Sequence, residues 1–149
     1  MARITGEITI ARPIDVVFDF VTDERNEPTY NPDLLSSEKV TAGPIRLGTK
    51  FTAVHKARRR PIDMVIEVTE YDRPRRMGST TATPAGEVRG GLTFEEVEGG
   101  TRLRWLWEMR PRGVARFLGP LVRLVGNRQE RACWAGLKRY MESVPQSSR

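Results

Sequence analysis

His55 is the single histidine of the chain, and alternation along residues 49–57 places it on the same face as Phe51 and Ala53. An imidazole titrates near neutral pH, so an inward-facing histidine can serve as a general base. Near a strand end it can instead bond to the local backbone or reach solvent. The hydroxyl of Tyr30 could orient a ligand carbonyl, or it could only anchor its loop. His55 and Tyr30 are therefore the catalytic candidates, and the pattern assigns no role to either.

Other polar residues of the strands offer less catalytic chemistry. Ser79 and Thr81 could donate hydrogen bonds to a ligand or face only the neighbouring strands, because the run of hydroxyl residues around them makes the two faces alike. Asp63, Glu67 and Glu108 fall on outward strand positions. We therefore expect no inward pair of carboxylates for acid–base catalysis.

Cys133 is the only cysteine, so no intramolecular disulfide can form. One histidine and one cysteine, without carboxylates at ligand spacing, predict no metal site, and we expect no cofactor. The chain has no run of about 18 apolar residues, and its N-terminus enters a strand pattern without the apolar core of a signal peptide. A cytoplasmic protein without a membrane span is the simplest expectation.

The elements that would position these residues are mostly strands. Alternating apolar and polar residues recur, with turn signals between them, at residues 3–11, 34–42, 49–57, 61–71, 76–83, 87–97 and 101–110. Short connections of this kind predict an antiparallel meander. Gly90-Gly91, inside one strand pattern, predicts a bend or bulge of the sheet rather than a phosphate loop.

Two short helices are expected after the first strand. Ile14, Val17, Phe18 and Val21 have the spacing of a helix with one buried face. The prolines within residues 26–32 leave room for at most a short second helix before the chain extends again.

The segment from residue 113 to residue 144 has a helical pattern that is not uniform. Its apolar arc changes direction at Gly126-Asn127, and Asn127 with Glu130 fits a capping box. This predicts a kink or short break there, with a second irregular point at Pro120.

Trp105, Trp107 and Met109 alternate on one face of residues 101–110, opposite a helix that carries small side chains. Alternating aromatic residues usually belong to a core. Two indoles opposite small side chains nevertheless favour a lined cavity, which would bind a ligand. The residues expected to line it are Tyr30, Phe51, His55, Met64, Ile66, Met77, Ser79, Leu92, Trp105, Trp107, Met109, Val125 and Gln129.

The length of 149 residues predicts a single domain over residues 1–145 followed by a disordered tail, residues 146–149. The net charge is +6, with basic clusters at residues 56–60 and 73–76. Such clusters can attract nucleic acid or an anionic surface. No nucleic-acid recognition motif accompanies them, so we expect a solvated basic surface, no nucleic-acid partner, and a monomer or homodimer.

The order of these elements resembles the START-like superfamily, also called SRPBCC, and within it the polyketide cyclase/dehydrase branch. The segments that carry the resemblance are Ile8–Pro13, Val17–Val21, Tyr30–Pro32, Gly48–Phe51, Gly99–Trp105 and Leu137–Glu142. The resemblance implies an α+β helix-grip fold, in which a curved seven-stranded antiparallel sheet wraps around a long C-terminal helix. It also implies two short helices after the first strand and a deep apolar cavity between sheet and helix.

Three functions are compatible with these observations. The first is binding of a hydrophobic or aromatic small molecule, lipid-like or polyketide-like, without catalysis. The second is a polyketide cyclase or dehydratase, in which Tyr30 and His55 would assist proton transfer. The third is a regulatory or interaction protein that uses the basic face of its last helix.

Overall fold

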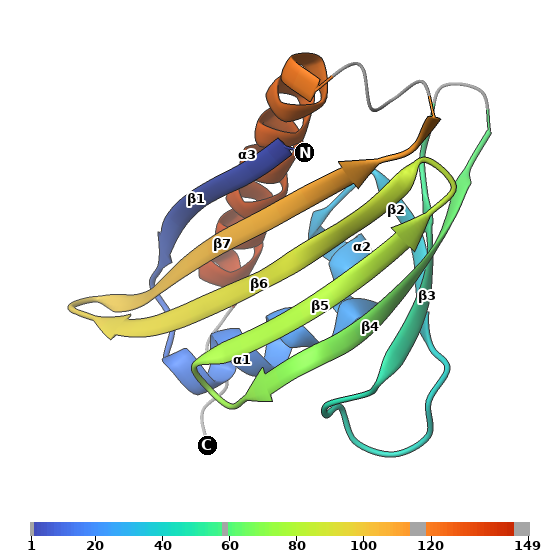
Figure 1. Cartoon of the computed structure of the whole chain (residues 1–149). Helices are drawn as coiled ribbons and strands as arrows, with labels where there is room; N and C mark the ends of the chain where they lie inside the picture. Colours follow the sequence, from blue (N-terminus) through green and yellow to red (C-terminus); the bar gives the residue numbers. More distant parts are fainter. Residues whose placement is uncertain (1, 58–59, 114–118, 145–149) are drawn as a thin grey trace.

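An antiparallel sheet and one long helix make up most of the chain. The computed structural model describes residues 2–57, 60–113 and 119–144 (Figure 1). In chain order, its elements are β1 (Ala2–Ile10), α1 (Ile14–Thr22), the 3₁₀ helix η1 (Glu24–Asn26), α2 (Glu27–Tyr30), β2 (Leu34–Lys39), β3 (Lys50–His55), β4 (Ile62–Asp72), β5 (Arg76–Thr83), β6 (Gly86–Val97), β7 (Gly100–Pro111) and α3 (Gly119–Ser143).

The described strands form one open seven-stranded sheet in the order β1-β7-β6-β5-β4-β3-β2. All neighbouring strands are antiparallel, and β2 to β7 follow one another as a meander. The N-terminal strand adds to the far edge by pairing with β7, which sets Ile4 beside Trp107 and Gly6 beside Trp105. This topology confirms the sequence prediction of an antiparallel meander. Its physical reason is that short turns leave no length for crossover connections.

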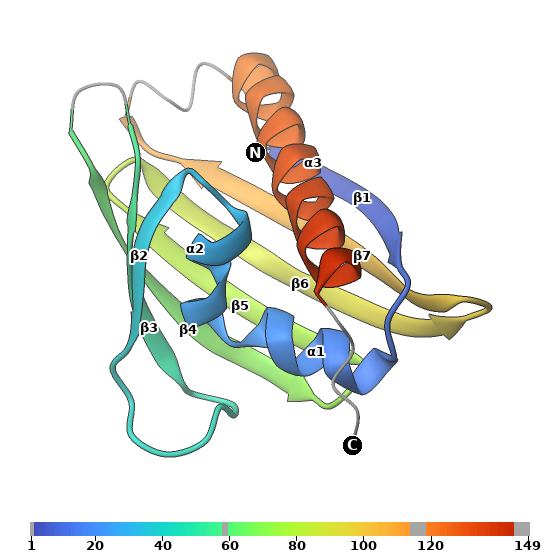
Figure 2. The same ribbon diagram turned by 180° about the vertical axis from the view of Figure 1, so that it is seen from behind.

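The helices that the structure describes all cover the same face of the sheet (Figure 2). The predicted apolar face of α1 is buried through Ile14, Val17, Phe18 and Val21. The short second helix consists of η1 followed directly by α2. The α+β helix-grip architecture is therefore confirmed, with the sheet curved around α3.

The predicted break in the last helix is wrong, since α3 runs unbroken through Gly126-Asn127. A Cβ on Gly126 would lie 2.3 Å from Cδ1 of Ile4. The glycine is therefore needed for close contact between α3 and β1, not for a helix end. Glu130 does not cap a helix start, because its carboxylate accepts hydrogen bonds from Trp107 and Trp134.

The start of the last helix accommodates the proline that predicted a second irregular point. Pro120 stands in the first turn of α3 as described, where its missing N–H removes no helical hydrogen bond. Residues 114–118, part of the predicted helix, and the predicted tail at residues 146–149 lie outside the described residues. None of the described helices combines the length and apolar character needed to cross a lipid bilayer.

Gly90 allows strands β6 and β7 to approach closely. Its φ is +150°, and a Cβ there would lie 1.9 Å from the carbonyl oxygen of Leu106. The pairing of β6 with β7 keeps one register through Gly90-Gly91, so the predicted bulge is absent at this point. Register shifts occur instead between Leu34 and Ser36 and between Val68 and Glu70.

Candidate functional site

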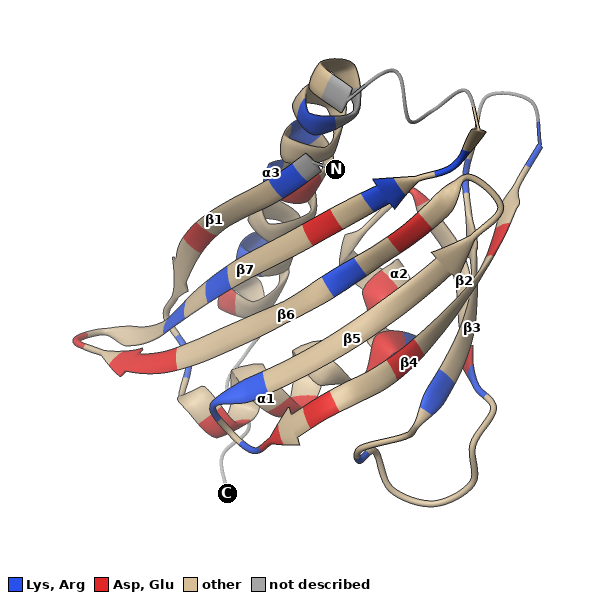
Figure 3. Cartoon of the chain, viewed as in Figure 1, with Lys and Arg blue, Asp and Glu red and all other residues tan. Residues whose placement is uncertain are grey.

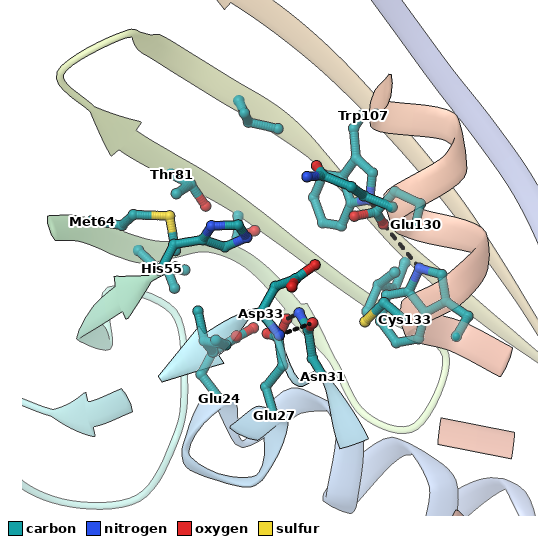
Figure 4. Close-up of a pocket in the computed structure, with 18 of the residues that line it drawn as sticks. Glu24, Glu27, Asn31, Asp33, His55, Met64, Thr81, Trp107, Glu130 and Cys133 are labelled. Atoms are coloured by element: carbon teal, nitrogen blue, oxygen red, sulfur yellow. Dashed lines mark hydrogen bonds between the residues drawn. The ribbon is translucent and has the colours of Figure 1, made fainter. Parts of the chain in front are cut away.

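A cavity of about 220 Å³ lies between the helices and the covered face of the sheet (Figure 4). Strands β1 to β7 all contribute residues to one wall, and α1, η1, α2, the segment after α2 and α3 form the other. Its lining residues are Ile4, Val21, Glu24, Glu27, Tyr30, Asn31, Asp33, Leu34, His55, Met64, Ile66, Met77, Ser79, Thr81, Val88, Leu92, Trp107, Met109, Gly126, Gln129, Glu130, Cys133 and Trp134.

Most residues expected to line a cavity do so. The structure places at its wall Tyr30, His55, Met64, Ile66, Met77, Ser79, Leu92, Trp107, Met109 and Gln129. Alternation along β3, β4 and β7 identified the inward face correctly, because side chains of a strand alternate between the two faces of a sheet. Thr81 joins Ser79 on the inner face of β5, which resolves the ambiguous parity of that strand.

Three expected lining residues lie elsewhere. Phe51 is fully buried in the core, and Val125 is 45% exposed on the outer side of α3. Trp105 stacks on Trp134 with ring centroids 5.7 Å apart, over the space left by Gly6. The missing side chain of Gly6, on the paired strand, gives Trp105 its room, so this indole is core and does not border the cavity.

Acidic side chains line the cavity, contrary to the expectation of no inward carboxylate pair. Asp63 and Glu67 do lie on the outer face, but the strands are not the source of the internal carboxylates. The helices and the segment after α2 supply Glu24, Glu27, Asp33 and Glu130. On α3, Glu130 has helical spacing with Gly126, Cys133 and Leu137, and this spacing could have indicated from the sequence that Glu130 faces the cavity.

Glu130 is held by two tryptophans. Its Oε1 accepts a hydrogen bond from Nε1 of Trp107 at 2.8 Å and one from Nε1 of Trp134 at 2.9 Å. Burial raises the pKa of Glu130 to about 7, against the opposing effect of the two indole hydrogen bonds. A carboxyl group with this pKa can donate or accept a proton near neutral pH.

Glu24 and Glu27 form an acidic pair on consecutive short helices. Burial, the negative charge of Glu27 and a hydrogen bond with Glu27 raise the pKa of Glu24 well above its ordinary value. Oε2 of Glu27 accepts a hydrogen bond from Nδ2 of Asn31 at 2.7 Å, and Oδ1 of Asn31 accepts one from the backbone N–H of Asp33. These bonds fix the segment that carries Asp33 to α2.

The two catalytic candidates from the sequence both border the cavity. Nδ1 of His55 lies 2.7 Å from the carbonyl oxygen of Lys56, so Nδ1 carries the proton of that hydrogen bond. The second ring nitrogen, Nε2, is then the one available to a ligand. Tyr30 lies between the rings of Phe20 and Trp134, and burial raises the pKa of its phenol, which favours a proton-bearing hydroxyl.

Cys133 also borders the cavity, and burial raises the pKa of its thiol far above the ordinary value. A thiol of this kind is a poor nucleophile and a poor metal ligand. Among the side chains that the structure describes, no group of three or more His, Cys, Asp or Glu residues is arranged to hold a metal ion.

Charges of both signs are spread along the outer face of the sheet (Figure 3). Arg102 and Arg104 lie near Glu7 and Glu95, and Arg3 pairs with Glu108. These pairs reduce the positive potential of this face, which is therefore no uniform basic surface.

Comparison with known proteins places the chain in a family. The family model described as "Polyketide cyclase / dehydrase and lipid transport" matches residues 1–142. No curated protein matches the chain.

Solved structures share the fold at low sequence identity. A START superfamily protein from Mycobacterium smegmatis has a TM-score of 0.84 and 9% identity, over 97% of this chain and all of the other. A protein from Thermus thermophilus has a TM-score of 0.80 and 18% identity, over 95% of this chain and 99% of the other. The Zhui aromatase/cyclase from Streptomyces sp. R1128 has a TM-score of 0.79 and 13% identity, over 94% and 93%. With a family match over nearly its whole length, the chain belongs to the polyketide cyclase/dehydrase and lipid transport family.

Proposed function

We propose that the protein binds a hydrophobic or aromatic small molecule in the cavity between its sheet and α3. The observation that carries this proposal is the cavity itself, about 220 Å³ in volume, with aliphatic, thioether and indole side chains over most of its wall. A pocket of this kind removes most of a small ligand's apolar surface from water, while a few polar groups fix its orientation. The family description, which names lipid transport beside cyclases, is compatible with this function.

A matched pair of variants tests where a ligand binds. Thr81 lines the cavity, whereas its neighbour Thr80 points to the other face of β5 and pairs beside Glu67 and Arg89. A Thr81→Phe variant would occupy the cavity, and Thr80→Phe adds the same ring outside it. The probe is N-phenyl-1-naphthylamine, an uncharged aromatic dye whose fluorescence rises in apolar surroundings.

We expect saturable binding of one dye molecule by the unaltered protein and by Thr80→Phe, and at least tenfold weaker binding by Thr81→Phe. Circular dichroism and urea unfolding of both variants check that the fold is intact. Equal binding by Thr81→Phe and Thr80→Phe would place the dye outside the cavity and contradict the proposal.

A second candidate function is catalysis of the cyclase or dehydratase type, favoured by Glu130. This buried carboxyl group borders the cavity, has a pKa of about 7, and uses only Oε1 for its two indole hydrogen bonds. A protonated Glu130 could donate a proton to a ligand carbonyl, with Tyr30 and His55 nearby as further polar groups. With any substrate that is turned over, Glu130→Gln is expected to lower kcat at least a hundredfold while substrate affinity changes little. Unchanged kcat would remove Glu130 from the mechanism.

A further inference from the structure

The cavity is lined by acidic side chains although the whole chain carries a net charge of +6. Glu24, Glu27, Asp33 and Glu130 line it, and the described residues of its wall include no lysine or arginine. In the described part of the chain, every ion pair involves other acidic residues. The carboxylates of the cavity therefore have no counter-charge from an ion pair there.

The hydrogen bonds in the cavity occupy only some of the oxygen atoms of these four carboxyl groups. Indole N–H groups occupy Oε1 of Glu130, and Asn31 occupies Oε2 of Glu27. No hydrogen bond to the carboxylate of Asp33 or to Oε2 of Glu130 occurs among the described residues. Figure 4 shows the Asp33 side chain pointing into the space between His55 and Glu130. These oxygens are therefore free to accept hydrogen bonds from donors that a ligand brings into the cavity.

The other titratable groups at the cavity do not neutralise it. Tyr30 and Cys133 are uncharged, because burial raises the pKa of both. His55 uses Nδ1 for the Lys56 carbonyl and contributes at most one positive charge. A ligand with its own carboxylate would bring a further negative charge to this wall, whereas a cation would be attracted to it.

The opposite part of the cavity suits an apolar body. Ile66, Met77, Leu92 and Met109 project from the sheet, and the indole ring of Trp107 lies at the boundary between the apolar and acidic walls. An aromatic face next to carboxylates also favours a cation, through the attraction between a positive charge and the π-electrons of the ring.

We infer that the ligand of this cavity is an amphiphilic amine, with its apolar or aromatic body against the sheet and its ammonium group among Asp33, Glu130 and the Glu24–Glu27 pair. The inference rests on the proposed ligand-binding function and narrows its ligand class. The ammonium group would donate its hydrogens to the oxygens that lack donors. Since it favours ionised carboxyl groups, its binding would release protons from Glu24 and Glu130.

Three probes with the same aromatic body test the inference: 2-(2-naphthyl)ethylamine, 2-(2-naphthyl)ethanol and 3-(2-naphthyl)propanoate. Isothermal titration calorimetry at pH 6.5 is expected to give at least tenfold tighter binding of the amine than of the alcohol, and the weakest binding for the propanoate. The heat of amine binding should vary with the ionisation enthalpy of the buffer in the direction of proton release, and the heat of alcohol binding should not.

Asp33→Asn removes one charge while preserving side-chain shape and the backbone N–H that bonds to Asn31. It is expected to weaken amine binding at least fivefold and to leave alcohol binding within twofold. Asp63→Asn, on the exposed face of β4, is the control and should change neither. If Asp33→Asn unfolds at a lower urea concentration than the unaltered protein, Glu27→Gln provides a second test.

The outcomes separate the inference from the function on which it rests. Alcohol binding without an amine preference, or an amine preference that survives both Asp33→Asn and Glu27→Gln, would overturn the cationic ligand and leave the binding function standing. Failure of all three probes to bind would contradict both.

Discussion

Replacing Glu130 by glutamine should stabilise the protein at neutral and alkaline pH. The amide carbonyl of the introduced glutamine can accept the same two indole hydrogen bonds, but glutamine never ionises. Glu130 in the folded protein has a pKa of about 7, against an ordinary value of 4.5. Between these pH values the folded protein retains a proton that the unfolded chain has released. Its free energy of unfolding therefore falls as the pH rises through this range.

The size of the effect follows from the two pKa values. Each pH unit of difference corresponds to about 1.4 kcal/mol, so a rise from 4.5 to about 7 costs the folded state about 3 kcal/mol once Glu130 is ionised. Glu130→Gln removes this cost. The difference in unfolding free energy between variant and unaltered protein should therefore grow by about 3 kcal/mol between pH 4 and pH 8.

Urea unfolding followed by tryptophan fluorescence, at half-unit pH steps from 4 to 8.5, measures this difference directly. Comparison with the variant cancels the other titrating groups, provided that they titrate alike in both proteins. Glu67→Gln, on the exposed face of β4, is the matched control for the exchange of a carboxyl group for an amide. A Glu130→Gln difference that grows no more with pH than the Glu67→Gln difference would refute the reasoning, since Glu130 would then ionise in the folded protein as it does in water.

Two further predictions concern backbone packing and the buried thiol. Gly90→Ala should lower the free energy of unfolding by about 2 kcal/mol or more, because its Cβ would lie 1.9 Å from a backbone oxygen of β7. Gly99→Ala, where φ is +88° but no atom lies within 4 Å, should cost only about 1 kcal/mol, and equal losses in urea unfolding would contradict the packing argument. Cys133 should react with 5,5′-dithiobis(2-nitrobenzoic acid) at pH 8 only after urea unfolding, because burial raises the pKa of its thiol. Rapid reaction of the folded protein would show an accessible thiolate.

Local patterns predicted most of the architecture. Each strand pattern became a strand because alternation and turn residues are properties of a few consecutive residues. The apolar wall followed for the same reason, since Met64 and Ile66 on β4 or Trp107 and Met109 on β7 need only the parity of their own strand. Prediction failed at Gly126, where a signal typical of a helix break serves instead as a contact surface for Ile4.

The sequence by itself determined the strands, the turns, the buried face of α1 and the family to which the chain belongs. Only the tertiary structure decided that Glu24, Glu27, Asp33 and Glu130 share one cavity. Glu130 is about a hundred residues away from the other acidic residues along the chain, and no local period relates it to them. Their meeting depends on the rotation and position of α3, which the Gly126–Ile4 contact and the stacking of its tryptophan on the sheet hold in place.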